Sequence, residues 1–141
     1  AGDETLLGGD GAENLNGSFG NDVLEGGNGN DFLEGGVGND ILTGGAGADS
    51  FEFLSLAWTA TVGMDTITDY DVHEDRLVFS DDFLDMAPGE TLIQNVIALE
   101  GDGGAELWAD VIDEGLTQIA FVENLTAAQL QGELTEALLM I

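Results

Sequence analysis

A large apolar residue recurs at every ninth position along the first third of the chain, with glycines after it and a carboxylate two places before it. Five full nonapeptide copies begin at Gly8, Gly17, Gly26, Gly35 and Gly44, and a shortened copy precedes them. The apolar eighth positions are Leu6, Leu15, Leu24, Leu33, Leu42 and Phe51. Glycines at positions one, two and four permit tight turns with positive φ and close backbone approach. Positions seven to nine are then expected to form a short strand with only the eighth side chain turned inward.

Turn and strand units repeated in this way predict a right-handed parallel β-roll with two nonapeptides in each coil. The inward residues would stack into a narrow apolar column closed by Phe51. Turns eighteen residues apart would lie above one another on the same side. We therefore expect Asp22 to pair with Asp40 on one side and Asp31 with Asp49 on the other.

The sixth position of the repeat carries a carboxylate in each copy, and this position indicates a metal site. It is aspartate in four copies and Glu4 or Glu13 in the two N-terminal ones, where the longer side chain weakens the site. Carboxylates and turn carbonyls supply the oxygen donors that Ca²⁺ prefers, whereas Mg²⁺ demands a stricter octahedron. The predicted calcium ligands are Asp22, Asp31, Asp40, Asp49, Glu13, Gly17, Gly20, Gly26, Gly27, Asn28, Gly29, Asn30, Gly35, Gly36, Gly38, Asn39, Gly44, Gly45 and Gly47.

The consecutive copies resemble the calcium-binding nonapeptide of the RTX (repeats-in-toxin) family, whose members leave the cell by type I secretion. The segments GMDTITDY and EDRLVFS that follow are similar to the family's capping segment. The resemblance implies that Asp69 and Asp65 complete the last calcium site over the turn at Gly44 or Gly35, although both residues also suit a simple strand cap. It implies about three to five calcium ions. It also implies an export signal at the C-terminal end, where residues 133–141 are similar in character.

Composition divides the chain into three parts: a calcium-binding parallel β-roll over 1–52, an antiparallel β capping region over 53–125, and a tail over 126–141. Strand-like runs occur at 65–70, 76–79, 91–99, 106–112 and 118–122. The stretch GDGG at 101–104 indicates a hairpin turn. Leucines at four-residue spacing make the tail a candidate amphipathic helix. The chain is thus predicted to be all-β, apart from this tail.

The charge balance is extreme, with 29 acidic residues against one basic residue, Arg76, and a net charge of -28. Such a chain repels itself, so bound cations are the expected remedy. Nucleic acid and anionic membranes are excluded as partners because both require a basic face. There is no cysteine and no apolar run long enough to span a membrane. The start within a repeat suggests a fragment of a longer protein.

Other polar and aromatic residues carry weaker signals. His73 is the only histidine and lacks the partners of a zinc or catalytic site. Ser55, Thr59 and Ser80 have no base beside them in the sequence, so no enzymatic activity is predicted. Arg76 is expected to be structural, and Trp58 and Trp108 are expected to pack rather than to stack on sugars. A solvated acidic surface is expected for Asp71, Glu74, Asp75, Asp81, Asp82 and Asp85.

These features predict a secreted, monomeric calcium-dependent folding module that supports export and stability of a larger protein. Its C-terminal tail would contact the type I secretion machinery. The alternative is a carbohydrate-binding module resembling the R-modules of alginate epimerases. With one arginine, a neutral glycan suits this chain better than a polyanion. A regular ladder of an ice-binding or adhesin array is absent at position nine, where the residues are Asn16, Glu25, Glu34, Thr43 and Glu52.

Overall fold

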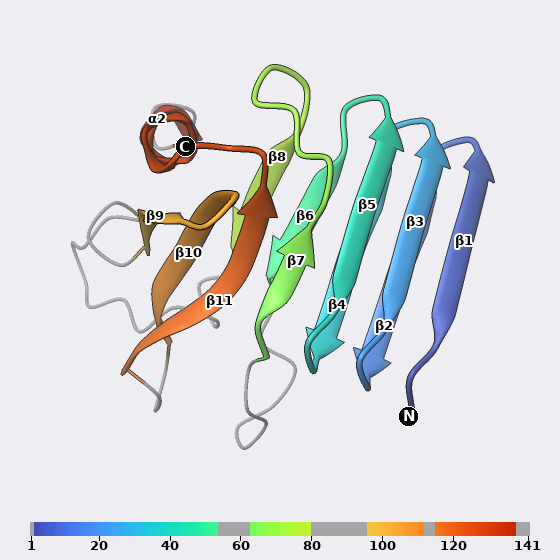
Figure 1. Ribbon diagram of the computed structural model, residues 1–141. Coiled ribbons are helices and arrows are strands. Elements are labelled where there is room, and N and C mark those ends of the chain that lie inside the picture. Colours follow the sequence, from blue (N-terminus) through green and yellow to red (C-terminus); the bar gives the residue numbers. More distant parts are fainter. Residues whose placement is uncertain (1, 54–62, 80–95, 112–114, 138–141) are drawn as a thin grey trace.

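The computed structural model describes residues 2–53, 63–79, 96–111 and 115–137 (Figure 1). The predictions for Ser55, Trp58, Thr59, Ser80, Asp81, Asp82 and Asp85 lie outside these residues, as do 91–95 and 138–141. Within the described ranges, no helix is long and apolar enough to cross a membrane.

The nonapeptides form six strands in two parallel sheets. The strands are β1 (Thr5–Asp10), β2 (Asn14–Phe19), β3 (Val23–Asn28), β4 (Phe32–Val37), β5 (Ile41–Ala46) and β6 (Ser50–Phe53). Odd-numbered strands pair in one sheet and even-numbered strands in the other, so the chain crosses between sheets at every turn (Figure 1). Leu24 pairs with Leu42 and Leu33 with Phe51, which confirms two nonapeptides in each coil.

The repeat strands are six residues long where full copies follow, rather than the three that we expected. Each strand continues past position nine into the glycine pair of the next copy. Gly9 pairs with Gly27 and Gly27 with Gly45, so these glycines extend the ladder before the chain turns. The sharp part of the turn is therefore confined to positions four to six.

Parallel pairing continues after the last nonapeptide. Strand β7 (Asp65–Ile67) adds to β5, and β8 (Arg76–Phe79) adds to β6. Ile67 lies beside Leu42, and Leu77 lies beside Phe51, as an apolar eighth position would. These two strands supply one more coil without the nine-residue period. The division into parts at residues 52 and 125 stays a prediction.

An antiparallel unit follows and extends the odd-numbered sheet. It consists of β9 (Val96–Gly101), β10 (Gly104–Val111) and β11 (Gly115–Glu123). The hairpin predicted at 101–104 is confirmed, since Gly101 pairs with Gly104. Strand β11 runs parallel to β7, with Val122 beside Ile67. The result is a seven-stranded sheet in the order β1-β3-β5-β7-β11-β10-β9, facing a four-stranded sheet β2-β4-β6-β8.

The tail contains helix α2 (Ala127–Ala137), which packs against β9 and β10. The helix begins at Ala127 because Thr126 and Gln129 form a reciprocal capping box. The Gln129 N–H donates to Thr126 Oγ1 at 3.3 Å, and the Thr126 N–H donates to Gln129 Oε1 at 3.1 Å. The predicted fold class, a parallel β-roll with an antiparallel region and a short helix, is confirmed.

One apolar core runs from the roll into the antiparallel unit. Leu24, Leu33, Leu42, Phe51 and Ile67 are fully buried in the roll. Their column continues through Leu107, Ile119, Val122 and Leu130. Leu6 and Leu15 are only half-buried, because they lie in the first coil. The core holds the two sheets together and leaves the turns at the edges of the roll.

Candidate metal centre

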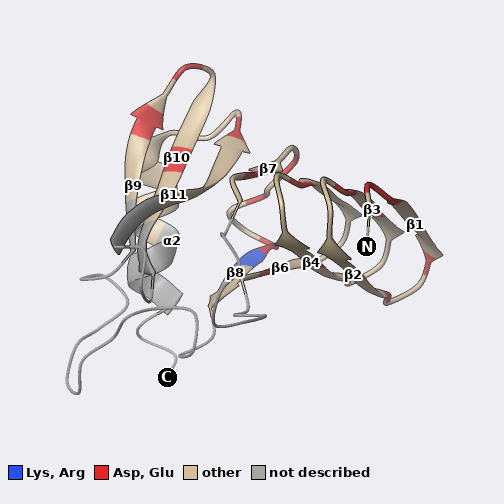
Figure 2. Cartoon of the chain, turned by 90° about the horizontal axis from the view of Figure 1, so that it is seen from below, with Lys and Arg blue, Asp and Glu red and all other residues tan. Residues whose placement is uncertain are grey.

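The carboxylates of position six stack along each edge of the roll. Asp40 Oδ1 accepts the backbone N–H of Asp22 at 2.7 Å, and Asp49 Oδ1 accepts that of Asp31 at 2.8 Å. Each pair is separated by 18 residues, which is one coil. The structure therefore brings together both pairs that the repeat predicted. Figure 2 shows acidic residues lying along the turns at the edges of the roll.

Each stack extends in both directions. Toward the N-terminus, Asp22 Oδ1 accepts the N–H of Glu4, and Asp31 Oδ1 accepts that of Glu13. The Glu13 carboxylate turns back to the Gly9 N–H at 3.0 Å, so the longer side chain departs from the aspartate pattern. Toward the C-terminus, Asp65 Oδ1 accepts the N–H of Asp40 at 3.1 Å. One edge is thus Glu4, Asp22, Asp40 and Asp65.

Asp75 completes the other edge, and its assignment to a solvated surface was wrong. It is 9% exposed, and its Oδ1 accepts the Asp49 N–H at 2.9 Å. Its neighbours Asp71 and Glu74 are exposed, as expected. A signal was present in the sequence: Asp75-Arg76-Leu77 and Asp65-Thr66-Ile67 both repeat the acid and apolar spacing of Asp49-Ser50-Phe51.

The second oxygen of each repeat aspartate is buried without a hydrogen-bond partner. This applies to Oδ2 of Asp22, Asp31, Asp40 and Asp49, whose residues are at most 1% exposed. An unpaired buried carboxylate is costly. Arg76, the one basic residue of the chain, cannot compensate four carboxylates, and its Nε donates to Ser50 Oγ. A bound cation would compensate the charge of these buried oxygens.

Burial also shifts the acidity of these groups. It raises the pKa of Asp40 and of Asp49, and the neighbouring Asp22 and Asp31 carboxylates add to these shifts. Burial, together with the Asp40 carboxylate, raises the pKa of Asp65 to about 8. Without a counter-charge the folded roll disfavours ionised carboxylates at these positions.

The first glycine of each repeat makes room for a second kind of oxygen. A Cβ at Gly26 would collide with Asp31 Oδ2 and would lie 2.6 Å from the Gly44 carbonyl oxygen. A Cβ at Gly17 would meet Asp22 Oδ2 and the Gly35 carbonyl oxygen in the same way. A carboxylate oxygen of the same repeat and a carbonyl oxygen of the next coil therefore both lie against the Cα hydrogen of this glycine. Only glycine fits there.

This donor set fits calcium. Ca²⁺ takes six to eight oxygen ligands, including backbone carbonyls, in flexible geometry. Among the described residues, no point gathers three or more Asp, Glu or His side chains. Most of the ligands would therefore have to be backbone carbonyls of the turns, with one carboxylate from each of two coils.

The turn glycines divide into two structural roles. From the second full copy onward, positions two and four have positive φ, as expected: Gly27, Gly36 and Gly45 at 102° to 108°, and Gly20, Gly29, Gly38 and Gly47 at 135° to 139°. Ser18, which replaces glycine at position two, has φ 74°. Position one does not have positive φ, contrary to our expectation. Its glycine is required by the close approach of the oxygens instead.

The remaining predicted ligands hold turns to one another. The amide of Asn28 donates to Asp10, Asn30 Oδ1 accepts the Ala48 N–H, and Asn39 Oδ1 accepts the Met64 N–H. Asp69 lies over the turn at Gly44, where its two oxygens accept the N–H groups of Gly44 at 2.9 Å and Gly45 at 2.8 Å. A ligand role for these four residues, as for the other predicted ligands, stays a prediction.

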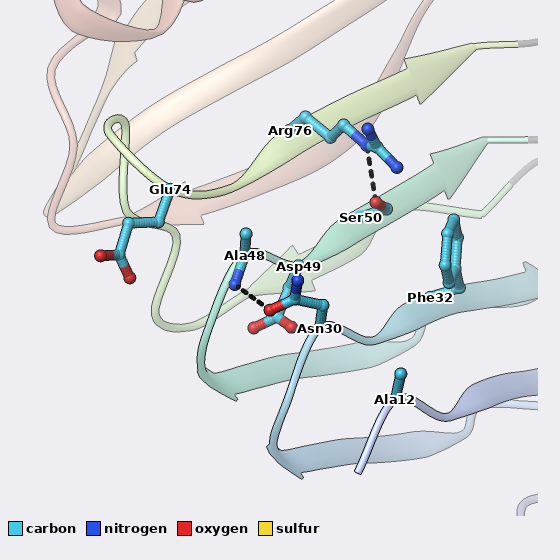
Figure 3. A pocket seen from close by; sticks show the side chains of 8 residues that line it. All are labelled: Ala12, Asn30, Phe32, Ala48, Asp49, Ser50, Glu74 and Arg76. Carbon is cyan, nitrogen blue, oxygen red and sulfur yellow. Dashed lines mark hydrogen bonds between the residues drawn. The ribbon is translucent and has the colours of Figure 1, made fainter.

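Arg76 ties the extra coil to the repeats. Figure 3 shows it reaching from β8 toward Ser50, beside a pocket that Asp49 and Phe32 also line. Its Nε donates to Ser50 Oγ at 2.7 Å, and its guanidinium carbon lies 5.8 Å from the Phe32 ring centroid. This contact fits the structural role expected of Arg76. His73 is exposed, as expected, and Trp108 is half-buried with its Nε1 donating to Glu106.

Comparison with known proteins agrees with the geometry of the edges. A sequence model of the RTX calcium-binding nonapeptide repeat matches residues 7–42 and 16–51. Comparison with curated proteins found no match. Among solved structures, the chain is similar to the AlgE6R3 subunit of the mannuronan C5-epimerase from Azotobacter vinelandii. The identity is 30%, the match covers 91% of this chain and 77% of that one, and the TM-score is 0.60.

A second subunit of the same enzyme, AlgE6R2, is 30% identical, with 88% of this chain and 86% of that one covered and a TM-score of 0.52. The class of protein that the fold and the edges define is a calcium-binding parallel β-roll. The chain belongs to the RTX calcium-binding nonapeptide-repeat family. Its repeats form a calcium-binding module and not a catalytic one.

Proposed function

We propose that this chain is a calcium-dependent folding module that becomes compact outside the cell and supports the secretion and stability of a larger exported protein. One observation carries the proposal. Four buried aspartate oxygens at the edges of the roll have no hydrogen-bond partner. In a chain with a net charge of -28, folding leaves them uncompensated unless calcium is bound.

The successive aspartates of each stack would hold the ions. On one edge the pairs are Asp22 with Asp40 and Asp40 with Asp65. On the other edge they are Asp31 with Asp49 and Asp49 with Asp75. Two pairs on each edge make four sites, within the range that the resemblance implied. The carbonyls of the turn glycines, such as Gly35 and Gly44, would supply further ligands.

The free energy of binding is large enough to control folding. Extracellular calcium modules bind with dissociation constants of roughly 10⁻⁴–10⁻³ M. A site at tenfold that concentration stabilises the folded state by about 1.4 kcal/mol, so four independent sites contribute about 6 kcal/mol. This is comparable to the whole stability of a small domain. Where calcium is scarce, repulsion and the entropy of the glycine-rich turns favour the unfolded chain.

An unfolded chain can pass through an export channel, and this links the calcium response to secretion. Repeats of this family are typical of secreted bacterial proteins. In the proposal, residues 1–52 respond to calcium, 53–125 cap the roll, and the tail at 126–141 contacts the type I secretion machinery. The module acts as an extracellular monomer.

Circular dichroism during a calcium titration from EDTA tests the folding response of the 141-residue chain. The expected result is a cooperative change from a largely disordered to a β-rich spectrum. Asp31→Asn and Asp40→Asn should both raise the calcium midpoint. Asp102→Asn removes the same charge from the exposed hairpin turn and should leave the midpoint unchanged. A β-rich spectrum in EDTA that calcium does not alter would refute the proposal.

A carbohydrate-binding module is a second candidate, and the likeness to two subunits of a mannuronan C5-epimerase favours it. A chain with one arginine is a poor partner for a polyanion, so the ligand would be a neutral glycan. A glycan array probed with and without calcium separates the two functions. Binding to one class of neutral glycan in calcium alone would support the carbohydrate module.

A further inference from the structure

The outer face of the four-stranded sheet carries a row of polar residues outside the turns. The row consists of Asn16 on β2, Glu34 on β4 and Glu52 on β6, all at position nine of the repeat. Asn16 pairs directly with Glu34. Glu34 and Glu52 follow the paired residues Leu33 and Phe51, so they are neighbours on adjacent strands. Adjacent strands lie about 4.8 Å apart.

Glu34 is the unusual member of this row. It is 8% exposed, and its Oε1 is buried without a hydrogen-bond partner. Its Oε2 accepts a hydrogen bond from the Asn16 amide. Burial raises the pKa of Glu34, and the Glu52 carboxylate raises it further. Two carboxylates side by side on a sheet destabilise it, and here one of them is also withdrawn from water.

The nearby positive charge of Arg76 does not compensate the negative charges of Glu34 and Glu52. Arg76 lies on β8 at the edge of the same sheet, with Nε bonded to Ser50 and its guanidinium over the Phe32 ring. Position nine on β8 is taken by Val78, which pairs with Glu52. Within the row, Glu34 and Glu52 therefore have the Asn16 amide as their one polar neighbour.

We propose that Glu34 and Glu52 form a calcium site on the outer face of the four-stranded sheet, separate from the turn sites. Both supply hard carboxylate oxygens, and their two negative charges match a divalent cation. The Asn16 amide nitrogen donates to Glu34 Oε2 while its Oδ1 accepts a hydrogen bond from Ser18 Oγ at 2.9 Å, so Glu34 Oε1 remains for the ion. Calcium accepts such an irregular, partly hydrated set of ligands. This site uses no position-six aspartate, so it goes beyond the folding function proposed above.

The other sheet offers a matched comparison. There, position nine is Glu25 on β3, between Leu7 on β1 and Thr43 on β5. Glu25 is exposed, and neither of the residues paired with it carries a carboxylate. A change of Glu25 to glutamine therefore removes one charge from the same repeat position without touching a paired carboxylate.

The test compares Glu34→Gln, Glu52→Gln and Glu25→Gln in the 141-residue chain. Native mass spectrometry counts the bound calcium ions, circular dichroism reports the folded fraction in EDTA, and thermal unfolding is followed in saturating calcium. Glu34→Gln and Glu52→Gln should each bind one ion fewer than the unmodified chain, and Glu25→Gln should bind the same number. In EDTA the first two changes should raise the folded fraction, because repulsion is relieved. In calcium they should lower Tm, because an ion is lost.

Opposite signs in the two buffers distinguish a cation site from simple repulsion or a shared proton. An unchanged ion count, with a higher folded fraction in EDTA and also a higher Tm in calcium, would overturn the proposal. Asp31→Asn serves as the reference for a turn site. If it loses an ion while the Glu34 and Glu52 variants do not, the turn sites stand and the outer site is refuted.

Discussion

The carboxylate of Asp75 accepts the backbone N–H of Asp49 at 2.9 Å, and it thereby repeats the contact that Asp49 makes with Asp31 one coil earlier. A tight turn holds it there, since its other oxygen accepts the Asp71 N–H at 2.8 Å. The Tyr70 hydroxyl donates to the Asp75 carbonyl at 3.3 Å. The chain thus rebuilds, after the repeats have ended, the carboxylate position of a further repeat.

Replacement of Asp75 by asparagine should raise the calcium midpoint of folding as much as Asp31→Asn does. The variant keeps the size of the side chain but removes one of the two carboxylate charges at the proposed site between Asp49 and Asp75. The expected loss is about 1.4 kcal/mol, the contribution of one site at tenfold saturation. Circular dichroism during calcium titration measures it. Asp71→Asn, an exposed neighbour with the same charge change, is the control. Equal midpoints for Asp75→Asn and Asp71→Asn would exclude Asp75 from calcium binding.

A methyl group at the first position of the repeat should disturb the edge directly. Gly26→Ala places a Cβ against the Asp31 carboxylate and the Gly44 carbonyl oxygen. We expect a loss of about 1–3 kcal/mol in the free energy of unfolding, as for other overpacked sites. Gly9→Ala is the control because a Cβ there meets nothing within 4 Å. Urea unfolding in saturating calcium compares the two, and equal stabilities would contradict the close approach seen at Gly26.

The repeat predicted much of this arrangement because its period determines both the register of strand pairing and which side chains face the core. Once two nonapeptides form a coil, the pairing of Asp22 with Asp40 and the burial of Leu33 follow from spacing alone. The period stops after Phe51, so the parallel pairing of β7 and β8 with the roll could not be predicted by counting, although strands were expected at 65–70 and 76–79. Each resumes the ladder after a longer connection, as the separation of 25 residues between Asp40 and Asp65 shows.

Two further features depend on contacts that no local pattern reports. The parallel pairing of β11 with β7 joins segments far apart in the sequence. The burial of Glu34 is also a tertiary effect, because Glu25 holds the same repeat position and is exposed. Nothing in the sequence separates Glu25 from Glu34, and only the structure distinguishes them.

The apolar column should contribute stability in proportion to burial. Leu33 is fully buried between the sheets, whereas Leu15 lies in the first coil and is half-buried. Leu33→Ala should lower the free energy of unfolding by about 2–5 kcal/mol. Leu15→Ala should have a clearly smaller effect, since less apolar surface is lost. Urea unfolding in saturating calcium measures both changes, and equal losses would show that the first coil is as well packed as the second.

The chelated protein should lose stability as the pH rises from about 4 to about 8. Burial, followed by the Asp40 carboxylate, raises the pKa of Asp65 from 3.8 to about 8, so the folded state retains a proton that the unfolded state releases. Where the folded state binds more protons, the free energy of unfolding falls with increasing pH. Burial raises the pKa of Asp40, Asp49 and Asp75 in the same direction. Circular dichroism in EDTA should therefore show a larger β-rich fraction at pH 5 than at pH 8.

Saturating calcium should reverse this trend, because the ion binds the ionised carboxylates and protons compete with it. Thermal unfolding in saturating calcium should thus give the higher Tm at pH 8. Asp65→Asn removes the most strongly shifted carboxyl and should flatten the dependence in EDTA. Asp102→Asn, in the exposed hairpin turn, should leave it unchanged. A β-rich fraction in EDTA that rises from pH 5 to pH 8 would mean that the buried aspartates are already compensated without calcium, and the electrostatic basis of the folding switch would then be wrong.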